Sequence, residues 1–405
     1  MQELNTVYKA FLELVKIGIG TSDRNFDFSV LSDEEWARLF TESKKQASAL
    51  LCFDSLKETN VKPKEELYNR WFIFSAATIK NNICVIEEQN KLVELLNSNT
   101  IPYVILKGTS SGNYYPDGKT RCSGDIDFIV DNDDLEKTRA LLLENEYVLD
   151  NDNSPIHYEF RKGKVRVELH KKISGIPDNK YGPYFVKSVD KIIEDAVLEN
   201  GFNRPSDFHH GIVIFLHMLH HLLNNGIGIR HLCDWACFVN KTHTESFWTE
   251  KLIPLLKTTG TFNFMCGLTI ASVHLLNINR PLWCKDVPDE MLNTIVLEIG
   301  SSGNFGFKKQ KKHSLIMTRM DSEKSSVFSK IRGMIKALHK TNHIVCPLIK
   351  KVPIIYPFVM IYRILRYVVL MCMGKKPSLI ETSRFATERS NVYMNYQLYK
   401  VEDDK

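Results

Sequence analysis

Two aspartates and one glutamate have the types and the spacing of a cation-binding set. Asp125 and Asp127 alternate with apolar residues in the segment DIDFIV, and Glu168 lies between two apolar residues in the segment KVRVELH. Successive side chains of a strand point to opposite faces of a sheet, so both aspartates are expected on one face. Carboxylate oxygens gathered in this way are the ligands that hard divalent cations prefer. We therefore predict that Asp125, Asp127 and Glu168 form a site for Mg²⁺ or Mn²⁺.

The apolar residues between these acids predict the opposite, buried face. Ile126 and Phe128 flank Asp127, and Val167 and Leu169 flank Glu168, so all four are expected in the core beneath the acids. A D-x-D pair by itself is more often the solvated face of an edge strand, and the third acid is what favours a metal site here. Because like charges repel when no ion is bound, Asp127→Asn is expected to leave the fold intact.

The order of these segments resembles the nucleotidyltransferase superfamily of DNA polymerase β. With h for an apolar residue, that superfamily has h-G-[GS], a spacer, D-h-[DE]-h and later h-[DE]-h. The chain is similar in particular to a bacterial family of uncharacterised nucleotidyltransferases, which has L-K-G, then Y-P-D, an Arg and D-I-D-h-h-V. The resemblance covers about residues 80 to 240, with Thr109 after the glycine and a longer spacer before the acids. The matching residues are Leu106-Lys107-Gly108, Tyr115-Pro116-Asp117, Arg121 and Asp125 to Val130.

The resemblance implies both a fold and a reaction. The fold is α+β, with a polymerase β-like core (a small mixed sheet with flanking helices), N-terminal helices and a large C-terminal helical region. The reaction moves a nucleoside monophosphate from an NTP to an acceptor and releases pyrophosphate. Asp125 and Asp127 would hold Mg²⁺ on the triphosphate, and Glu168 would bring a second ion or act as a base. The acceptor could be a small molecule, a protein or RNA.

The resemblance also implies a phosphate-binding turn. An apolar run ends at Lys107, and the small residues Gly108, Thr109 and Ser110 follow it. The backbone amides of these three residues, at the opening of a helix, are expected to receive phosphate oxygens. Lys107 and Arg121 are expected to neutralise the charge of the triphosphate.

Histidines are candidates for the acceptor side of the cleft. Alternation puts His170 on the face of Glu168, where it could contact a phosphate or a ligand of the metal. His217 and His221 are four residues apart on a predicted helix, which is also the spacing of a helical metal clamp. No H-E-x-x-H motif accompanies them, so we expect both to face the cleft rather than to bind zinc, with His209 further from the acids.

Arg230 and Asp234 complete the predicted acceptor side. Both lie in the segment IRHLCDW, which resembles an element that follows the helical histidines in the same family.

The composition is that of an ordinary globular protein. The chain has 405 residues, 43% of them hydrophobic and 25% charged, with a net charge of +5, which fits two domains or one large one. The nine cysteines form no C-x-x-C pair, so neither a zinc ribbon nor a disulfide framework is indicated. The N-terminal segment lacks the apolar run of a secretory signal. We expect reduced thiols and a cytoplasmic protein.

We divide the chain into four regions. They are an N-terminal helical scaffold (1–98), a nucleotidyltransferase core (99–200), a helical domain lining the cleft (201–300), and a basic linker, apolar helix and polar tail (301–405). The apolar segment from Val352 to Gly374 contains Arg363 and Arg366, and each would cost about 2.5–3.5 kcal/mol at the centre of a bilayer. A spanning helix is therefore not expected, and the segment should either dock on the protein or lie on an anionic membrane beside the basic stretch.

Two other functions stay open at this point. The chain could bind a nucleotide without turnover, although binding alone does not require three acids. It could also be a membrane-peripheral partner of a surface-polysaccharide or peptide-export system. A nucleic-acid acceptor would fit the basic stretch from Lys308 to Lys351, and its binding would weaken steeply with salt.

Overall fold

The computed structural model describes residues 5–224, 226–303, 342, 352–374 and 394–400, and it has a five-stranded sheet, a two-stranded sheet and many helices. This confirms the predicted α+β class with a small mixed sheet. The helices before the sheet are α1 (Thr6–Gly18), α2 (Asp33–Lys45), α3 (Ala49–Ser55) and α4 (Glu65–Ser98). Those within or after it are α5 (Thr109–Gly112), α6 (Leu135–Glu144), α7 (Gly182–Ser188), α8 (Asp207–Asn224), α9 (Ile229–Thr242), α10 (Ile253–Thr258), α11 (Phe262–Leu276), α12 (Asp289–Ser302) and α15 (Tyr356–Cys372).

The five-stranded sheet places the two acidic segments side by side. Its spatial order is β1-β2-β5-β4-β3, and β2 and β5 are parallel while every other neighbouring pair is antiparallel. The strands are β1 (Tyr103–Ile105), β2 (Asp125–Val130), β3 (Val148–Asn151), β4 (His157–Lys162) and β5 (Val165–His170). A separate hairpin pairs β6 (Val197–Glu199) with β7 (Phe202–Arg204). β4 and β5 form a hairpin around Gly163, and the positive φ of that glycine suits its turn.

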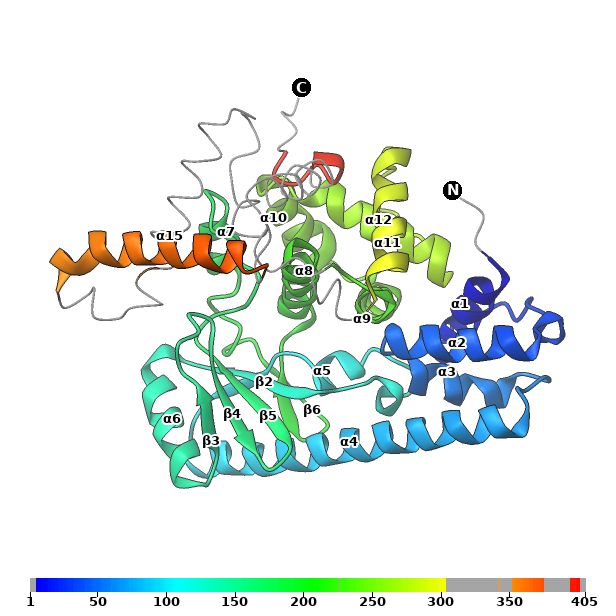
Figure 1. Ribbon diagram of the computed structural model, residues 1–405, viewed down its shortest axis with the longest axis horizontal. Helices are drawn as coiled ribbons and strands as arrows, with labels where there is room; N and C mark the ends of the chain where they lie inside the picture. The colour runs from blue at the N-terminus through cyan, green and yellow to red at the C-terminus, as the bar shows by residue number, and fades with distance from the viewer. Residues whose placement is uncertain (1–4, 225, 304–341, 343–351, 375–393, 401–405) are drawn as a thin grey trace.

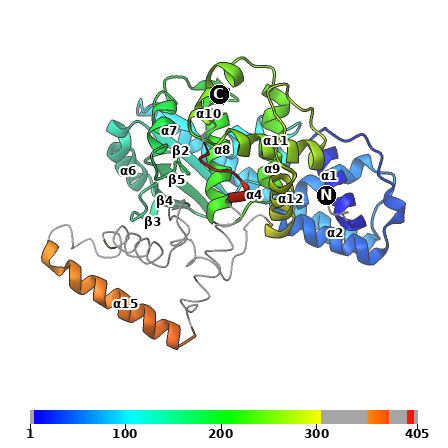
Figure 2. The same ribbon diagram turned by 90° about the horizontal axis from the view of Figure 1, so that it is seen from above.

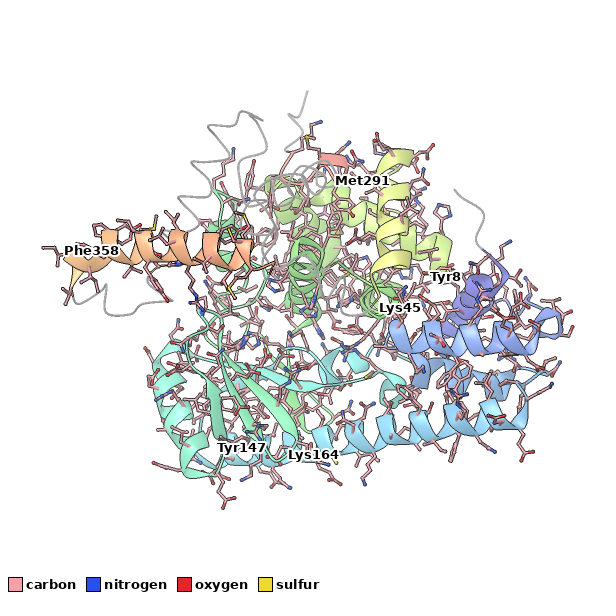
Figure 3. All side chains as sticks on the ribbon, viewed as in Figure 1. Tyr8, Lys45, Tyr147, Lys164, Met291 and Phe358 are labelled. Atoms are coloured by element: carbon pink, nitrogen blue, oxygen red, sulfur yellow. The ribbon has the colours of Figure 1, made fainter. Side chains whose placement is uncertain are left out.

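Alternation along β2 and β5 buries one face of the sheet as expected. Ile126, Phe128, Val167 and Leu169 are all buried in one apolar cluster, which confirms the predicted register. The long helix α4 lies beneath this face (Figure 1) and contributes the buried residues Val85, Leu92, Val93 and Leu96 to the same cluster. Tyr147 lies on this side of the sheet (Figure 3), and its hydroxyl donates to Glu88 on α4 at 2.7 Å.

A second, larger core joins α1 to α3 with α8, α9, α11 and α12. Figure 1 shows α8 to α12 above the opposite face of the sheet and α1 to α3 beside it, over one end of α4. α2 begins at a capping box formed by Ser32 and Glu35. Apolar packing thus links regions 1–98 and 201–300, and the four-region division stays a prediction.

α15 lies beside this body rather than within it (Figure 2). No helix of the part of the chain that the structure describes has the length and hydropathy needed to cross a bilayer. The predicted basic stretch from Lys308 to Lys351 and most of the polar tail lie outside the described residues.

Candidate active site

The three predicted acids lie on the face of the sheet that is opposite α4. Asp127 lies directly opposite Glu168 in the parallel β2–β5 pair, and Asp125 lies opposite Arg166. Residues facing each other in register share a face, so all three carboxylates point to the same side. Asp127 is the most buried, with a side chain 3% exposed, against 16% for Glu168 and 33% for Asp125. The set has the oxygen donors that a divalent cation requires, and in this respect the residues fit Mg²⁺ or Mn²⁺.

Two cationic side chains lie against the most buried of these acids. Lys107 Nζ is 2.8 Å from Asp127 Oδ1, and His170 Nε2 is 3.0 Å from the same oxygen and 3.5 Å from Glu168 Oε2. Burial alone would raise the pKa of Asp127, but Lys107 and His170 outweigh it and hold that pKa below its ordinary value. The expectation that these acids simply repel one another therefore fails for Asp127.

Asp125 is in the opposite electrostatic situation. Burial and the negative charges of Asp127 and Glu168 together raise the pKa of Asp125 to about 6, and Lys107 and Arg230 only partly oppose them. Ionising Asp125 in the metal-free protein thus costs free energy that a bound cation would offset.

Asp125→Asn is expected to stabilise the metal-free protein at neutral pH. The folded pKa of Asp125, about 6, lies above its ordinary value of 3.8. The charged carboxylate therefore lowers the free energy of unfolding. This loss is absent below about pH 4 and complete above about pH 6. The gain in melting temperature should therefore grow between pH 4.5 and pH 7.5. Thermal unfolding in the presence of EDTA across that range measures it, and a gain that is independent of pH would contradict the assignment.

The predicted phosphate-binding turn follows β1 directly. Gly108 has φ +65° and precedes α5, which is a single turn rather than a full helix. Two side chains of this turn already form hydrogen bonds. Thr109 Oγ1 donates to Gln89 on α4 at 2.7 Å, and Ser110 Oγ donates to the Ile105 carbonyl at 2.5 Å. The backbone of the turn, rather than these hydroxyls, is what remains to contact a phosphate.

Arg121 is held by Asp234 on α9. The Arg121 Nε and one terminal nitrogen are each 2.7 Å from an Asp234 oxygen, and the other terminal nitrogen donates to the Gly108 carbonyl at 3.2 Å. Tyr115 donates a further hydrogen bond to Asp234 at 2.8 Å. Both partners are buried. The sequence predicts Arg121 as a phosphate ligand and Asp234 as an acceptor residue, whereas the structure pairs their charges and uses them to brace the turn.

α4 holds the segment that carries Arg121. Asn82 donates to the Lys119 and Arg121 carbonyls, each at 3.0 Å, and accepts from the Ser123 backbone N–H at 3.0 Å. No role is predicted above for Asn82 or Gln89, although polar residues at buried positions of an amphipathic helix are a usable signal. Arg230 forms no ion pair with any residue that the structure describes, but its charge acts on Asp125.

One of the two predicted histidines of α8 lies beside Lys107. His217 lines a small cavity together with Lys107, Arg121, His231 and Asp234. His221 and His231 lie next to it, with ring centroids 4.5 Å and 5.8 Å from that of His217. By contrast, His209 contacts Ser206 and Asp195.

His217, His221 and His231 are all neutral at pH 7. Burial lowers the pKa of His217 well below its ordinary value, that of His221 to about 2 and that of His231 to about 3. They can therefore contribute hydrogen bonds to an acceptor but no positive charge. His231 Nδ1 accepts the Gly228 backbone N–H at 3.3 Å and thereby caps α9.

One comparison with known proteins identifies the family. Neither the curated proteins nor the solved structures include a significant match to the chain. A family model described as "Uncharacterised nucleotidyltransferase" matches residues 32–277, which is more than half of the chain and includes every candidate site residue named above. The chain therefore belongs to the uncharacterised nucleotidyltransferase family.

Proposed function

We propose that the protein is a metal-dependent nucleotidyltransferase that moves a nucleoside monophosphate from an NTP to an acceptor hydroxyl or phosphate. The observation that carries the proposal is the meeting of Asp125, Asp127 and Glu168 on one face of two adjacent parallel strands. A purely nucleotide-binding module would not need all three carboxylates, and the family of the chain supports transfer. We also infer that β1, β2 and β5 are the polymerase β-like part of the sheet.

The acids would act on the triphosphate and on the acceptor. A cation held by Asp125, Asp127 and Glu168 would supply positive charge at the α-phosphate and lower the pKa of the acceptor. The acceptor oxygen forms a bond to the α-phosphorus, the bond from that phosphorus to the bridging oxygen of the β-phosphate breaks, and pyrophosphate leaves. Glu168 lies opposite Asp127 and keeps access to solvent, and it would take the acceptor proton on the oxygen that is not bound to the cation.

The negative charge of the triphosphate requires cationic side chains that are free to leave, or do not have, a carboxylate partner. Arg121 is paired with Asp234, so we assign the β- and γ-phosphates to Arg230 and to Lys107. Lys107 would exchange Asp127 for a phosphate oxygen once a metal ion takes over that carboxylate. The turn at Gly108 would offer backbone N–H groups to the same phosphates, and the neutral histidines of α8 would line the acceptor side.

Labelled nucleotides test this function and reveal the acceptor class. The full chain is incubated with each α-labelled NTP, Mg²⁺ or Mn²⁺, and a cell lysate separated into small-molecule, RNA and protein fractions. Label should appear in one fraction only and should depend on the divalent ion. The absence of labelled product with every NTP, in all three fractions, would count against transfer and in favour of a binding module.

We also propose that α15 rests on an anionic membrane. Exposed apolar residues recur along it at helical spacing, namely Phe358, Ile361, Tyr362, Leu365 and Val369, and Figure 3 shows Phe358 away from the helical body. In the sequence, the basic stretch from Lys308 to Lys351 precedes this face, and basic residues beside an amphipathic helix favour anionic lipid.

Vesicle flotation tests the membrane contact. The full chain should float with anionic vesicles, less so at high salt, and not with neutral ones. The double variant Phe358→Asp/Leu365→Asp should remain unbound while its melting temperature stays close to that of the wild type. A wild-type chain that ignores anionic vesicles would remove this proposal without affecting the enzymatic one.

A further inference from the structure

Two histidines and an acid form a compact group beside the aspartates. His157 on β4 and His170 on β5 face each other directly in the antiparallel pair, and Glu168 lies two residues before His170 on the same strand. His157 Nδ1 is 3.3 Å and His170 Nε2 is 3.5 Å from Glu168 Oε2. One possible ligand atom from each of the three lies within 4.8 Å of the other two.

These separations are those of ligands around one metal ion. With bonds of about 2.1 Å to nitrogen and oxygen, two ligands at angles between about 90° and 109° lie roughly 3.0–3.4 Å apart. The two nitrogen-to-oxygen distances to Glu168 are close to this range before any ion is bound. Small adjustments of the side chains would therefore suffice to close a site.

The hydrogen bonding of His170 directs the right nitrogen toward the group. Its Nδ1 lies 3.3 Å from the Lys172 carbonyl oxygen, which can only accept, so Nδ1 carries a proton. Nε2 is the nitrogen that faces Glu168 and Asp127. In the metal-free protein it donates to Asp127 at 3.0 Å, so an ion that binds here takes the place of that proton. A backbone carbonyl that holds the other ring N–H in this way is the usual arrangement of a metal-binding histidine.

His157 provides a second, independent observation. Its Nδ1 is buried and has no hydrogen-bond partner, although it lies 3.3 Å from a carboxylate oxygen of Glu168. A buried polar atom without a partner costs free energy, and an ion between the imidazole and the carboxylate would satisfy both groups.

We propose that His157, Glu168 and His170 form a nitrogen-containing site for a first-row transition-metal ion next to the Asp125–Asp127 pair. This inference rests on the proposed function, because Glu168 belongs to both sets. Mg²⁺ favours oxygen ligands, whereas imidazole suits first-row transition metals. The position at Asp125 and Asp127 thus offers only oxygen ligands and accepts Mg²⁺. The position at His157, Glu168 and His170 selects against Mg²⁺.

The ligand atoms of the other histidine cluster lie as close together, but that cluster contains no carboxylate. In the group of His217, His221 and His231, Nδ1 of His231 accepts a backbone N–H from Gly228. That bond leaves the proton of the neutral ring on Nε2, where it blocks coordination. His221 is therefore a suitable control, since it is a histidine of similar surroundings in the same molecule.

Electron paramagnetic resonance of bound Mn²⁺ tests the site without any nucleotide. The full chain is stripped of metal and titrated with Mn²⁺ alone, and spin-echo modulation reports coordinated ¹⁴N. The wild type should show imidazole modulation, and His157→Gln and His170→Gln should each weaken it and reduce Mn²⁺ affinity on the order of tenfold. His221→Gln should match the wild type, and excess Mg²⁺ should displace this ion poorly.

Each outcome decides between the alternatives. Bound Mn²⁺ without ¹⁴N modulation, or modulation lost in His221→Gln but kept in His157→Gln, overturns the site. If His170→Gln fails to fold, His157→Gln decides, because His157 is partly exposed on its strand. If nitrogen binds Mn²⁺ but the protein transfers no nucleotide, the metal site stands and the proposed function fails. If the protein transfers a nucleotide but no nitrogen binds Mn²⁺, the proposed function stands and the metal site fails.

Discussion

Asp127→Asn is expected to abolish nucleotidyl transfer and to destabilise the fold as well. The remaining acids cannot hold the charge that the transferred phosphoryl group requires, so transfer should fall on the order of a thousandfold or more. Asp127 is also the buried counter-charge of Lys107 and His170. Removing one member of such a buried pair leaves the others uncompensated, which costs about 3 kcal/mol in the free energy of unfolding.

Asp125→Asn is the matched control for this variant. Both changes remove one carboxylate from the same strand, and both should inactivate the enzyme. Only Asp127→Asn should lower the stability of the metal-free protein at pH 7, because the pKa of Asp127 is lowered by its partners while that of Asp125 is raised to about 6. Denaturant unfolding and a transfer assay on both variants measure the contrast. Wild-type turnover by well-folded Asp127→Asn would contradict the metal-dependent mechanism.

Asp234→Asn is expected to have the largest effect on stability alone. It leaves the Arg121 guanidinium buried without its charged partner, and such a loss costs about 3–5 kcal/mol. Tyr115→Phe removes only one hydrogen bond to the same carboxylate and should cost about 1 kcal/mol. Urea unfolding of the two variants gives the comparison.

A double variant shows how much of the loss in stability comes from leaving one charge of the Arg121–Asp234 ion pair without its partner. Replacing both partners, as in Arg121→Met/Asp234→Leu, removes the two buried charges together and should be less destabilising than Asp234→Asn. Equal losses of stability in Asp234→Asn and Tyr115→Phe would show that the ion pair is not what braces the turn at Gly108.

Local patterns were sufficient to predict the strands and the acidic face. The alternation around Asp125 and Asp127 and around Glu168 gave the buried residues, because a strand has a fixed period of two. The same rule placed His170 beside Glu168, although its hydrogen bond to Lys172 depends on the loop that follows β5.

Long-range pairing could not be predicted in the same way. Arg121 and Asp234 are 113 residues apart in the sequence, and only the packing of α9 against the turn brings them together. The sequence does not show whether an arginine is paired with an acid, so Arg121 was predicted to bind the phosphates. His157 illustrates the same limit, because its place opposite His170 depends on the register of the β4–β5 hairpin.

The central claim is that the bond between the α- and β-phosphates is the one that breaks. The direct measurement is a parallel assay with NTP labelled at the α- or the γ-phosphate, in the presence of the acceptor fraction and with Asp127→Asn as the blank. If the protein transfers a nucleoside monophosphate, the acceptor should gain α-label and γ-label should appear in pyrophosphate. The blank should show neither. Transfer of γ-label to the acceptor, or equal α-labelling by Asp127→Asn, would contradict the central claim.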